Sequence, residues 1–261
     1  MEHDIVAAYL RRIGMTEPPG PPSVDLLTEL HMRHLGTVPF ENLSIHLDEP
    51  IVLDEDALVD KIVRRRRGGF CYELNGLFAV LLGALGFRVT RHAARVFDPE
   101  GSLGPPFDHL VLVVQLGDRW LVDVGFGRLT TYPLRLDSTE VQDDPEGKFL
   151  VTPAPYGDID LVRDGKPQYR METRPRSLDD FTMGAWWNST SPASHFTRSL
   201  TCSLRTEDGR VTLSADRLIR TVGDERTETV LPDDEAVLEA YQTIFGVVLE
   251  RVPKLRTQGG T

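Results

Sequence analysis

The spacing of apolar residues changes once along this chain, at Gly86, and this change limits the folds that the chain can adopt. Before Gly86 the apolar residues recur about every 3.6 residues, as on one face of an α-helix. After Gly86 they alternate with a period of two, in segments rich in valine, leucine and aromatic residues that are typical of strands. Helices followed by strands indicate an α+β protein in which the two kinds of element form separate layers.

Capping and breaking residues set the expected ends of these elements. Ser23 and Asp54 are of the types that cap helix N-termini, and Gly86 is a typical helix stop. The expected helices run from residue 5 to 13, from 23 to 36, from 54 to 68 and from 71 to 85. The expected strands cover residues 87–97, 109–116, 119–125, 149–152, 160–163 and 168–173, and a final region from residue 201 adds strands at 210–213 and 217–222 before a helix at 233–244.

Composition and charge exclude several classes of protein. The 261 residues are 40% hydrophobic and 26% charged, the profile of a soluble globular protein, and no apolar run approaches the roughly 20 residues of a membrane helix. A formal net charge of -11 argues against nucleic acid as a partner. The N-terminus lacks the basic segment of a secretory signal, and two cysteines are too few for a disulfide framework, so we expect a cytoplasmic protein with free thiols. No cluster of residues has metal-ligand spacing, so no metal is expected.

Cys71 is the strongest candidate for a nucleophile. It follows Gly68, Gly69 and Phe70 and begins the most apolar of the expected helices. The N–H groups and partial positive charge at a helix N-terminus favour a thiolate and can stabilise an oxyanion. The two glycines would let the backbone approach a ligand closely. Position alone does not separate this interpretation from a small buried cysteine, which is the role that we assign to Cys202.

A cysteine nucleophile usually works with a base, and the base with an orienting carboxylate. His109 begins the most apolar strand, and Asp123 lies in the next one, where a carboxylate among apolar residues requires a partner. A two-residue hairpin loop at 117–118 would place these two residues on opposite faces of the sheet. A three-residue loop at 116–118 would pair Asp123 with Val111 and make it a diagonal neighbour of His109. The triad hypothesis therefore predicts an odd-length loop or a bulge; taken alone, the histidine also fits a strand end and the aspartate a turn.

Five segments, in order along the chain, resemble the arylamine N-acetyltransferase family. The segment around Cys71 is the most specific of them, and together they extend from residue 38 to residue 247. The matching segments are VPFENL at 38–43, RRGGFCYELN at 66–75, His109 with WLVDVGFG at 120–127, SPASHF at 191–196 and IFGV at 244–247. The resemblance thus covers nearly the whole chain.

The resemblance implies a fold and a set of catalytic residues. The implied parts are an N-terminal helical bundle that carries the nucleophile at 1–86, a central antiparallel β-barrel that carries the histidine and aspartate at 87–190, and a C-terminal α/β lid at 191–261. It also implies a Cys-His-Asp triad, which corresponds here to Cys71, His109 and Asp123. As in cysteine proteases, the thiol would lie on a helix and the histidine on a sheet.

The activity that the resemblance implies is transfer of an acetyl group from acetyl-CoA, as co-substrate, to the nitrogen of an arylamine or arylhydrazine, a reaction of xenobiotic metabolism. The transfer would be ping-pong, through a thioester on the cysteine. Phe40, Phe126 and Phe196 resemble the acceptor pocket of the family, and a flat aromatic ring suits them, although each also fits ordinary core packing. Gly127 and Thr197 lie where the family would contact CoA. The expected partner is a small molecule, without nucleic acid or membrane, and the expected state is a monomer or homodimer.

Three further features of the sequence leave more than one interpretation. Asp108 occupies a position where many members of the family carry threonine, which would make the cleft more acidic. The arginines at 64–67 could attract CoA phosphates, but a solvated helix end is favoured, with Arg67 able to pair with a buried acid such as Glu41. The two tryptophans at 186–187 could form a ligand wall, but packing between barrel and lid is favoured.

Other functions are compatible with the same triad. An amide synthase of the same fold would release a carrier-bound polyketide chain by macrolactam formation and would use acetyl-CoA poorly. A thiol hydrolase would turn over thioesters without an acceptor. A non-catalytic protein that binds acyl-CoA or an aromatic ligand would lose nothing on Cys71→Ala, and the complete cysteine, histidine and aspartate set argues against it.

Overall fold

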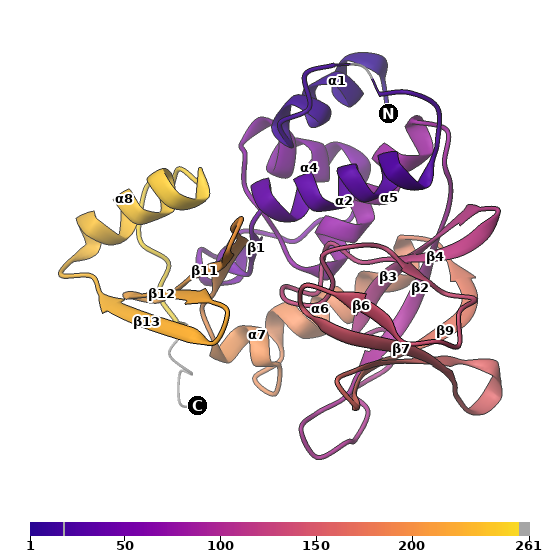
Figure 1. Cartoon of the computed structure of the whole chain (residues 1–261). Helices are drawn as coiled ribbons and strands as arrows, with labels where there is room; N and C mark the ends of the chain where they lie inside the picture. Colours follow the sequence, from indigo (N-terminus) through magenta and orange to yellow (C-terminus); the bar gives the residue numbers. More distant parts are fainter. Residues whose placement is uncertain (18, 256–261) are drawn as a thin grey trace.

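The computed structural model describes residues 1–17 and 19–255, and helices form the first part of it (Figure 1). They are α1 (His3–Arg12), α2 (Val24–Thr37), α3 (Leu43–His46), α4 (Glu55–Val59), the π-helix η1 (Asp60–Arg64) and α5 (Cys71–Ala84). The predicted caps are confirmed, because the side chains of Ser23 and Asp54 each accept a hydrogen bond from a backbone N–H three residues later. The single helix expected at 54–68 divides in two, since Arg65 N–H bonds five residues back, to the Asp60 carbonyl at 2.8 Å.

Helix α5 is the central element of this bundle. Eleven of its 14 residues are buried, so the helix is enclosed on every side, by the other helices and by strands β2 (Arg88–Val96) and β3 (His109–Leu116). A helix packed on all sides cannot shift without opening the core. Its first residue is therefore held at a fixed place relative to the sheet.

An eight-stranded antiparallel sheet follows the helices and curls into a nearly closed barrel (Figure 1). Its order is β5-β4-β3-β2-β9-β8-β7-β6. The strands not yet given are β4 (Asp118–Val122), β5 (Leu134–Arg135), β6 (Gln142–Asp144), β7 (Gly147–Pro153), β8 (Ile159–Arg163) and β9 (Lys166–Arg176). The two edge strands are joined by one side chain, because the Gln142 amide bonds both the N–H and the carbonyl of Arg135, at 2.7 and 2.9 Å. The predicted antiparallel barrel is confirmed.

The β3–β4 hairpin has the odd register that the triad hypothesis requires. Leu116 pairs with Asp118 and Leu112 with Val122, so the chain turns at Gly117, where φ is 72°. This register places residue 123 on the face of the hairpin that carries His109. The strand expected at 119–125 ends earlier, at Val122, because the chain after it bends toward α5.

The C-terminal part contains a five-stranded antiparallel sheet in the order β1-β10-β11-β12-β13, covered by a helix. Its elements are β1 (Phe40–Glu41), β10 (Cys202–Arg205), β11 (Gly209–Ser214), β12 (Arg217–Val222), β13 (Glu225–Val230) and the helix α8 (Asp234–Phe245). The segment before β10 contains η3 (Asp179–Phe181), α6 (Thr182–Thr190) and α7 (His195–Arg198), while the 3-10 turn η2 (Pro155–Gly157) lies between β7 and β8 of the barrel. Cys202 is fully buried in this sheet, and burial raises the pKa of its thiol well above the ordinary value, in agreement with a packing role.

Strand β1 joins the first and last parts of the chain. Phe40 pairs with Ser203 across the sheet, and Asn42 extends the connection through its side chain. The Asn42 amide donates to the carbonyl of Phe196 at 2.9 Å and accepts from Thr201 N–H at 2.9 Å. Within the described residues, no helix is long and apolar enough to cross a membrane.

Candidate active site

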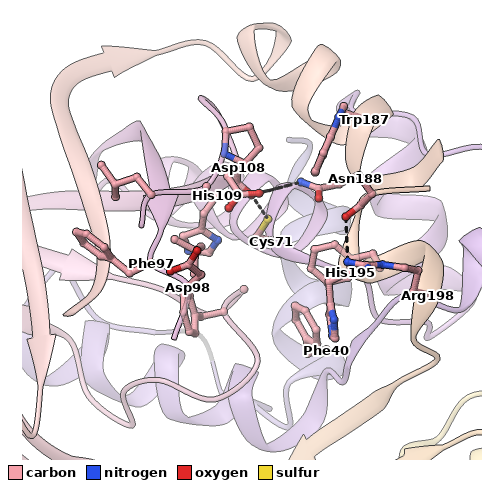
Figure 2. Close-up of a pocket in the computed structure, with 18 residues that line it drawn as sticks. Phe40, Cys71, Phe97, Asp98, Asp108, His109, Trp187, Asn188, His195 and Arg198 are labelled. Atoms are coloured by element: carbon pink, nitrogen blue, oxygen red, sulfur yellow. Dashed lines mark hydrogen bonds between the residues drawn. The ribbon is translucent and has the colours of Figure 1, made fainter. Parts of the chain in front are cut away.

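A cavity of about 520 Å³ lies where the first turn of α5 meets the barrel and the α6–α7 segment (Figure 2). Cys71 and His109 both line it, and Figure 2 shows them close together at its centre. Most of the remaining wall is apolar and aromatic. The cavity therefore offers a reactive thiol beside a surface that suits a flat ring.

Cys71 is the first residue of α5 and is 3% exposed. The N–H groups of the first turn and the partial positive charge of the helix face the cavity from this end. Glu73 stabilises the same turn, because one of its carboxylate oxygens accepts the Phe70 N–H at 3.3 Å. This arrangement holds the thiol where a bound carbonyl carbon could reach it.

His109 and Asp123 form the second half of the site. Nε2 of His109 lies 2.7 Å from Oδ2 of Asp123, and both side chains are buried. Burial alone would lower the pKa of the imidazole, but the charge of the Asp123 carboxylate, the hydrogen bond that it accepts from the ring, and the interaction with Cys71 raise it to about 10. Because Nε2 is engaged by the aspartate, Nδ1 is the ring nitrogen that remains for the cysteine. The structure thus brings all three predicted catalytic residues into one chain of contacts.

Asn75 holds this chain of contacts in place and was not predicted from the sequence. Its Nδ2 donates to Asp123 Oδ1 at 2.8 Å and to the Leu110 carbonyl at 2.7 Å, and its Oδ1 accepts the N–H of Val124 at 2.9 Å. A signal was present in the sequence. Asn75 stands one helical turn after Cys71 and is an amide on a mostly apolar helix, so it requires buried partners.

Gly125 lets the loop after β4 lie against α5. A Cβ at this position would come within 2.8 Å of the Cys71 Cα and 2.7 Å of Asn75 Nδ2. Gly68 and Gly69 were expected to let the backbone approach a ligand closely. In the structure they instead let the backbone lie close to other parts of the protein. A Cβ on Gly68 would lie 1.9 Å from the Pro39 carbonyl oxygen, and one on Gly69 would meet the side chain of Glu73. These glycines serve the packing that surrounds the thiol.

Comparison with known proteins agrees with this geometry. A sequence model of the N-acetyltransferase family matches residues 23–253. The chain is 39% identical over 258 residues to the arylamine N-acetyltransferase of Mycobacterium tuberculosis, which covers 93% of this chain and 89% of that protein. This chain belongs to the arylamine N-acetyltransferase family. It is accordingly an acyltransferase.

Solved structures of arylamine N-acetyltransferases share the whole fold. The enzyme from Salmonella typhimurium superposes with a TM-score of 0.88 at 32% identity, covering 98% of this chain and 96% of that one. An arylamine N-acetyltransferase from Mycobacterium marinum, solved in complex with CoA, superposes with a TM-score of 0.83 at 33% identity, covering 93% of this chain and 92% of that one. The predicted architecture of helical bundle, barrel and lid is therefore that of the family.

The three phenylalanines predicted for the acceptor pocket all line the cavity of this arylamine N-acetyltransferase family member. Phe40 and Phe196 have ring centroids 6.2 Å apart, and the Phe126 ring stands nearly perpendicular to the His109 imidazole at 5.2 Å. Trp187 joins the same wall, so one of the two tryptophans faces the cavity. The tryptophan before it is exposed and lies outside this cavity.

The two residues predicted to contact CoA do not line the cavity around Cys71. Gly127 adopts a φ of 92° and lies against the ring of Phe40. A Cβ added at this glycine would come within 3.3 Å of that ring. The hydroxyl of Thr197 donates to the carbonyls of Ser191 and Ser194, at 2.8 and 3.0 Å, so it is used within its own turn. No group of His, Cys, Asp or Glu that could hold a metal ion occurs in the described part of the chain.

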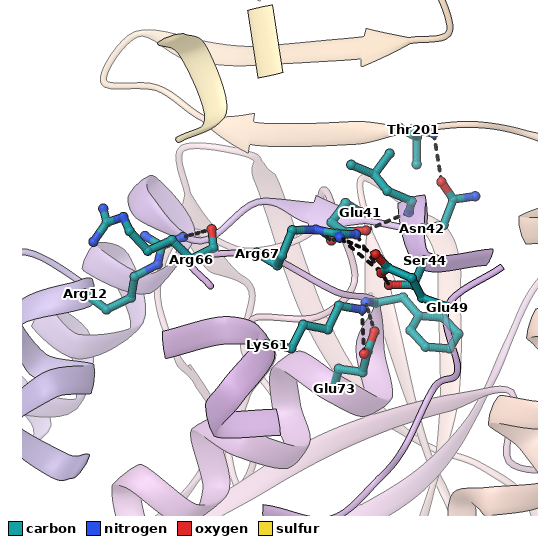
Figure 3. A network of polar contacts seen from close by, with 12 residues as sticks. Arg12, Glu41, Asn42, Ser44, Glu49, Lys61, Arg66, Arg67, Glu73 and Thr201 are labelled. Atoms are coloured by element: carbon teal, nitrogen blue, oxygen red, sulfur yellow. Dashed lines mark hydrogen bonds and ion pairs between the residues drawn. The ribbon is translucent and has the colours of Figure 1, made fainter. Parts of the chain in front are cut away.

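Buried charged side chains form ion pairs next to the start of α5 (Figure 3). Arg67 is 3% exposed and pairs with Glu41 at 3.0 Å and Glu49 at 3.1 Å, so it is not part of a solvated helix end, and the expected pairing with Glu41 is confirmed. Burial tends to raise the pKa of Glu41, but the arginine and Lys61 bring it below the ordinary value. Lys61 also pairs with Glu73 at 2.7 Å, and burial raises the pKa of Glu73 in spite of this cation.

Proposed function

We propose that this chain transfers an acetyl group from acetyl-CoA to the nitrogen of an arylamine or arylhydrazine, in ping-pong order, through a thioester on Cys71. The observation that carries the proposal is the geometry of three side chains. The thiol stands at a helix N-terminus and lines the same cavity as His109, whose Nε2 is held by Asp123 at 2.7 Å. Family membership supports the same transfer.

The first half-reaction would acetylate the enzyme. The Cys71 thiolate, paired with the His109 imidazolium, attacks the thioester carbonyl carbon, and the negative charge that develops on oxygen is stabilised by N–H groups of the first turn of α5. The C–S bond to CoA then breaks as the acetyl group remains on the cysteine. The CoA thiolate leaves and takes its proton from the imidazolium, so His109 becomes neutral.

The second half-reaction would acetylate the acceptor. The amine nitrogen attacks the acetyl carbon on Cys71, and neutral His109 accepts one of its protons. The C–S bond breaks and returns the Cys71 thiolate beside an imidazolium, which Asp123 stabilises and orients. The product is an N-aryl amide or hydrazide. Each half restores the charge state that the other requires.

The wall of the cavity supports an aromatic acceptor. Phe40, Phe126, Phe196 and Trp187 present ring faces and edges around the thiol. Offset and edge-to-face contacts would hold a flat ring with its amino group directed at the acetyl carbon. We retain Gly127 and Thr197 as proposed contacts to the acetyl-CoA donor. The three-part division at 1–86, 87–190 and 191–261 likewise remains a proposal for the domain boundaries.

The mass of the intact protein tests this function. Wild type and Cys71→Ser are mixed with acetyl-CoA, and an arylhydrazine is added afterwards. We expect one acetyl adduct on wild type alone, and its loss when the hydrazine is added. Loss of the adduct in water alone would favour a thiol hydrolase. No adduct, on folded protein whose Cys71 still reacts with a thiol reagent, would contradict acetyl-CoA as donor and favour the amide synthase of the same fold.

A further inference from the structure

Asp108 carries a carboxylate that lines the active-site cavity beside Cys71. It precedes His109 and lines the same cavity, and its backbone carbonyl lies 4.0 Å from Sγ of Cys71 (Figure 2). Within the described residues its side chain forms no ion pair. The charge of Arg95 acts on the carboxylate, but its guanidinium donates to the carbonyls of Gly104 and Leu103, at 2.7 and 3.5 Å, and not to Asp108.

The hydrogen bonds to this carboxylate are few and weak. The Asn188 amide reaches Asp108 Oδ1 only at 3.5 Å, because the same Nδ2 donates to Tyr72 Oη at 2.7 Å. The backbone of Val96 is the other hydrogen-bond partner of the carboxylate. The other oxygen lies over Gly104, where an added Cβ would come within 2.5 Å of it. Burial raises the pKa of Asp108 despite these donors and the nearby His109 imidazole, as expected for a carboxylate that lacks a full set of partners.

No cation in the described residues forms an ion pair with this carboxylate, although the charges of His109 and Arg95 act on it. Asp98 also lines the cavity, but it is exposed and accepts the N–H of Ser102 at 2.7 Å. On the facing wall His195 is exposed, and Arg198 is exposed and donates to backbone carbonyls of its own segment. An acceptor ring bound against the phenylalanines beside Cys71 would therefore meet a negative group next to the nucleophile.

We propose that Asp108 selects among aromatic acceptors by charge, favouring those that carry a cationic or hydrogen-bond-donating ring substituent and disfavouring those that carry a carboxylate. The physical reason is that a donor group on the acceptor would supply the partner that this carboxylate lacks, whereas a second carboxylate would be repelled across a cavity with apolar walls. The inference rests on the proposed acetyl transfer and names the class of acceptor that the site prefers.

Three acceptors of one shape test this selection: 4-aminobenzamidine, 4-aminobenzamide and 4-aminobenzoate, which are cationic, neutral and anionic at pH 7.5. Values of kcat/KM are measured for wild type, Asp108→Asn and Asp98→Asn with acetyl-CoA as donor. All three acceptors attack the same acetyl-enzyme, so their rate ratios do not depend on how fast that intermediate forms. The intrinsic reactivity of each amine cancels when a variant is compared with wild type.

We expect Asp108→Asn to lower the amidine-to-benzoate ratio by on the order of tenfold, and Asp98→Asn to change it much less because water screens that carboxylate. Asp108→Ser, which also removes the charge, should give the same direction and serves if the asparagine variant does not fold. If both Asp108 variants transfer acetyl to the neutral benzamide but leave the amidine-to-benzoate ratio of kcat/KM unchanged, the inference is overturned and the proposed function stays intact. An equal change in Asp98→Asn would overturn the assignment to Asp108. No transfer to any acceptor by wild type would overturn the proposed function itself.

Discussion

Oδ2 of Asp123 lies 2.7 Å from Nε2 of His109, and both atoms are buried where the β3–β4 hairpin opens toward the first turn of α5. The hairpin alone does not create this contact. Its register places both residues on one face, and Asn75, on a different element, then holds the other carboxylate oxygen at 2.8 Å. The catalytic aspartate is therefore positioned by a strand and a helix together, and each of these supports can be tested separately.

Asp123→Asn keeps the shape of the side chain and removes its charge. In wild type the pKa of His109 is raised to about 10, so the imidazole keeps its proton below that pH and loses it as the pH rises through it. Without the carboxylate, burial dominates and we expect this pKa to fall below about 6.5. Near neutral pH the imidazole of the variant would be neutral. The expected loss in kcat/KM at pH 7.5 is on the order of a thousandfold.

Alkylation of Cys71 by iodoacetamide between pH 5 and 10 checks the cause of that loss. With no imidazolium beside the thiol, the variant should react more slowly than wild type at pH 6–7, and the difference should shrink at high pH. Asp137→Asn is the control, because Asp137 is exposed and pairs with Arg119 on the outside of the barrel. An alkylation profile of Asp123→Asn that matched wild type would contradict the ion-pair account.

Asn75→Ala removes the amide that bonds Asp123, Leu110 and Val124. Buried donors and acceptors would lose partners, so we expect the free energy of unfolding to fall by about 1–3 kcal/mol. The freed carboxylate would also orient His109 less well, and kcat should fall by about tenfold or more while KM changes little. Urea unfolding and steady-state rates, both measured well below the melting temperature, check the two effects. A less stable protein with normal kcat would show that Asn75 supports only the fold.

Gly125→Ala tests the close approach of the loop to the nucleophile. The new methyl group would meet the Cys71 Cα at 2.8 Å, so the loop or α5 must move. We expect a loss of about 1–3 kcal/mol in the free energy of unfolding and a large loss of acetyl transfer, since the Cys71–His109 contact would change. Gly83→Ala is a control on the same helix. No atom lies within 4 Å of its added Cβ, and we expect a gain of about 0.5–1 kcal/mol with normal rates.

Much of this arrangement could be predicted from the sequence, because it depends on local patterns. The caps at Ser23 and Asp54 are set by nearby side-chain chemistry, and the full extent of β3 follows from its run of apolar residues. The hairpin register could be reduced to two alternatives by the pairing rule, and the triad hypothesis chose the one that occurs.

The parts that could not be predicted depend on contacts between distant segments. Strand β1 has two residues and no pattern of its own, and it exists because Phe40 pairs with Ser203 in the last sheet. Arg64, Arg65 and Arg66 are exposed, as expected of a solvated helix end. The predicted pairing of Arg67 with Glu41 occurs, but its second partner, Glu49, could not be predicted. Asp108 could be noted as unusual, but its lack of an ion pair within the described residues follows only from where Arg95 points.

The buried pair of Lys61 and Glu73 supplies the last prediction. Removing the cation alone, in Lys61→Met, leaves a buried carboxylate whose pKa is already raised by burial and should rise further. A raised pKa in the folded state means that the folded protein holds the proton more tightly than the unfolded chain. Stability should therefore fall as the pH rises above the unfolded value of about 4.3, with a loss near pH 8 of about 3–5 kcal/mol.

Urea unfolding at pH 5.5 and pH 8 measures this dependence, and Lys61→Met/Glu73→Gln is the matched variant. The double change removes both charges, so it should recover much of the lost stability at pH 8 and unfold with little pH dependence beyond that of wild type. Since Glu73 also accepts the Phe70 N–H at the start of α5, the single variant should weaken the turn that carries Cys71 and lower kcat. A single variant whose stability did not depend on pH would contradict the role assigned to this ion pair.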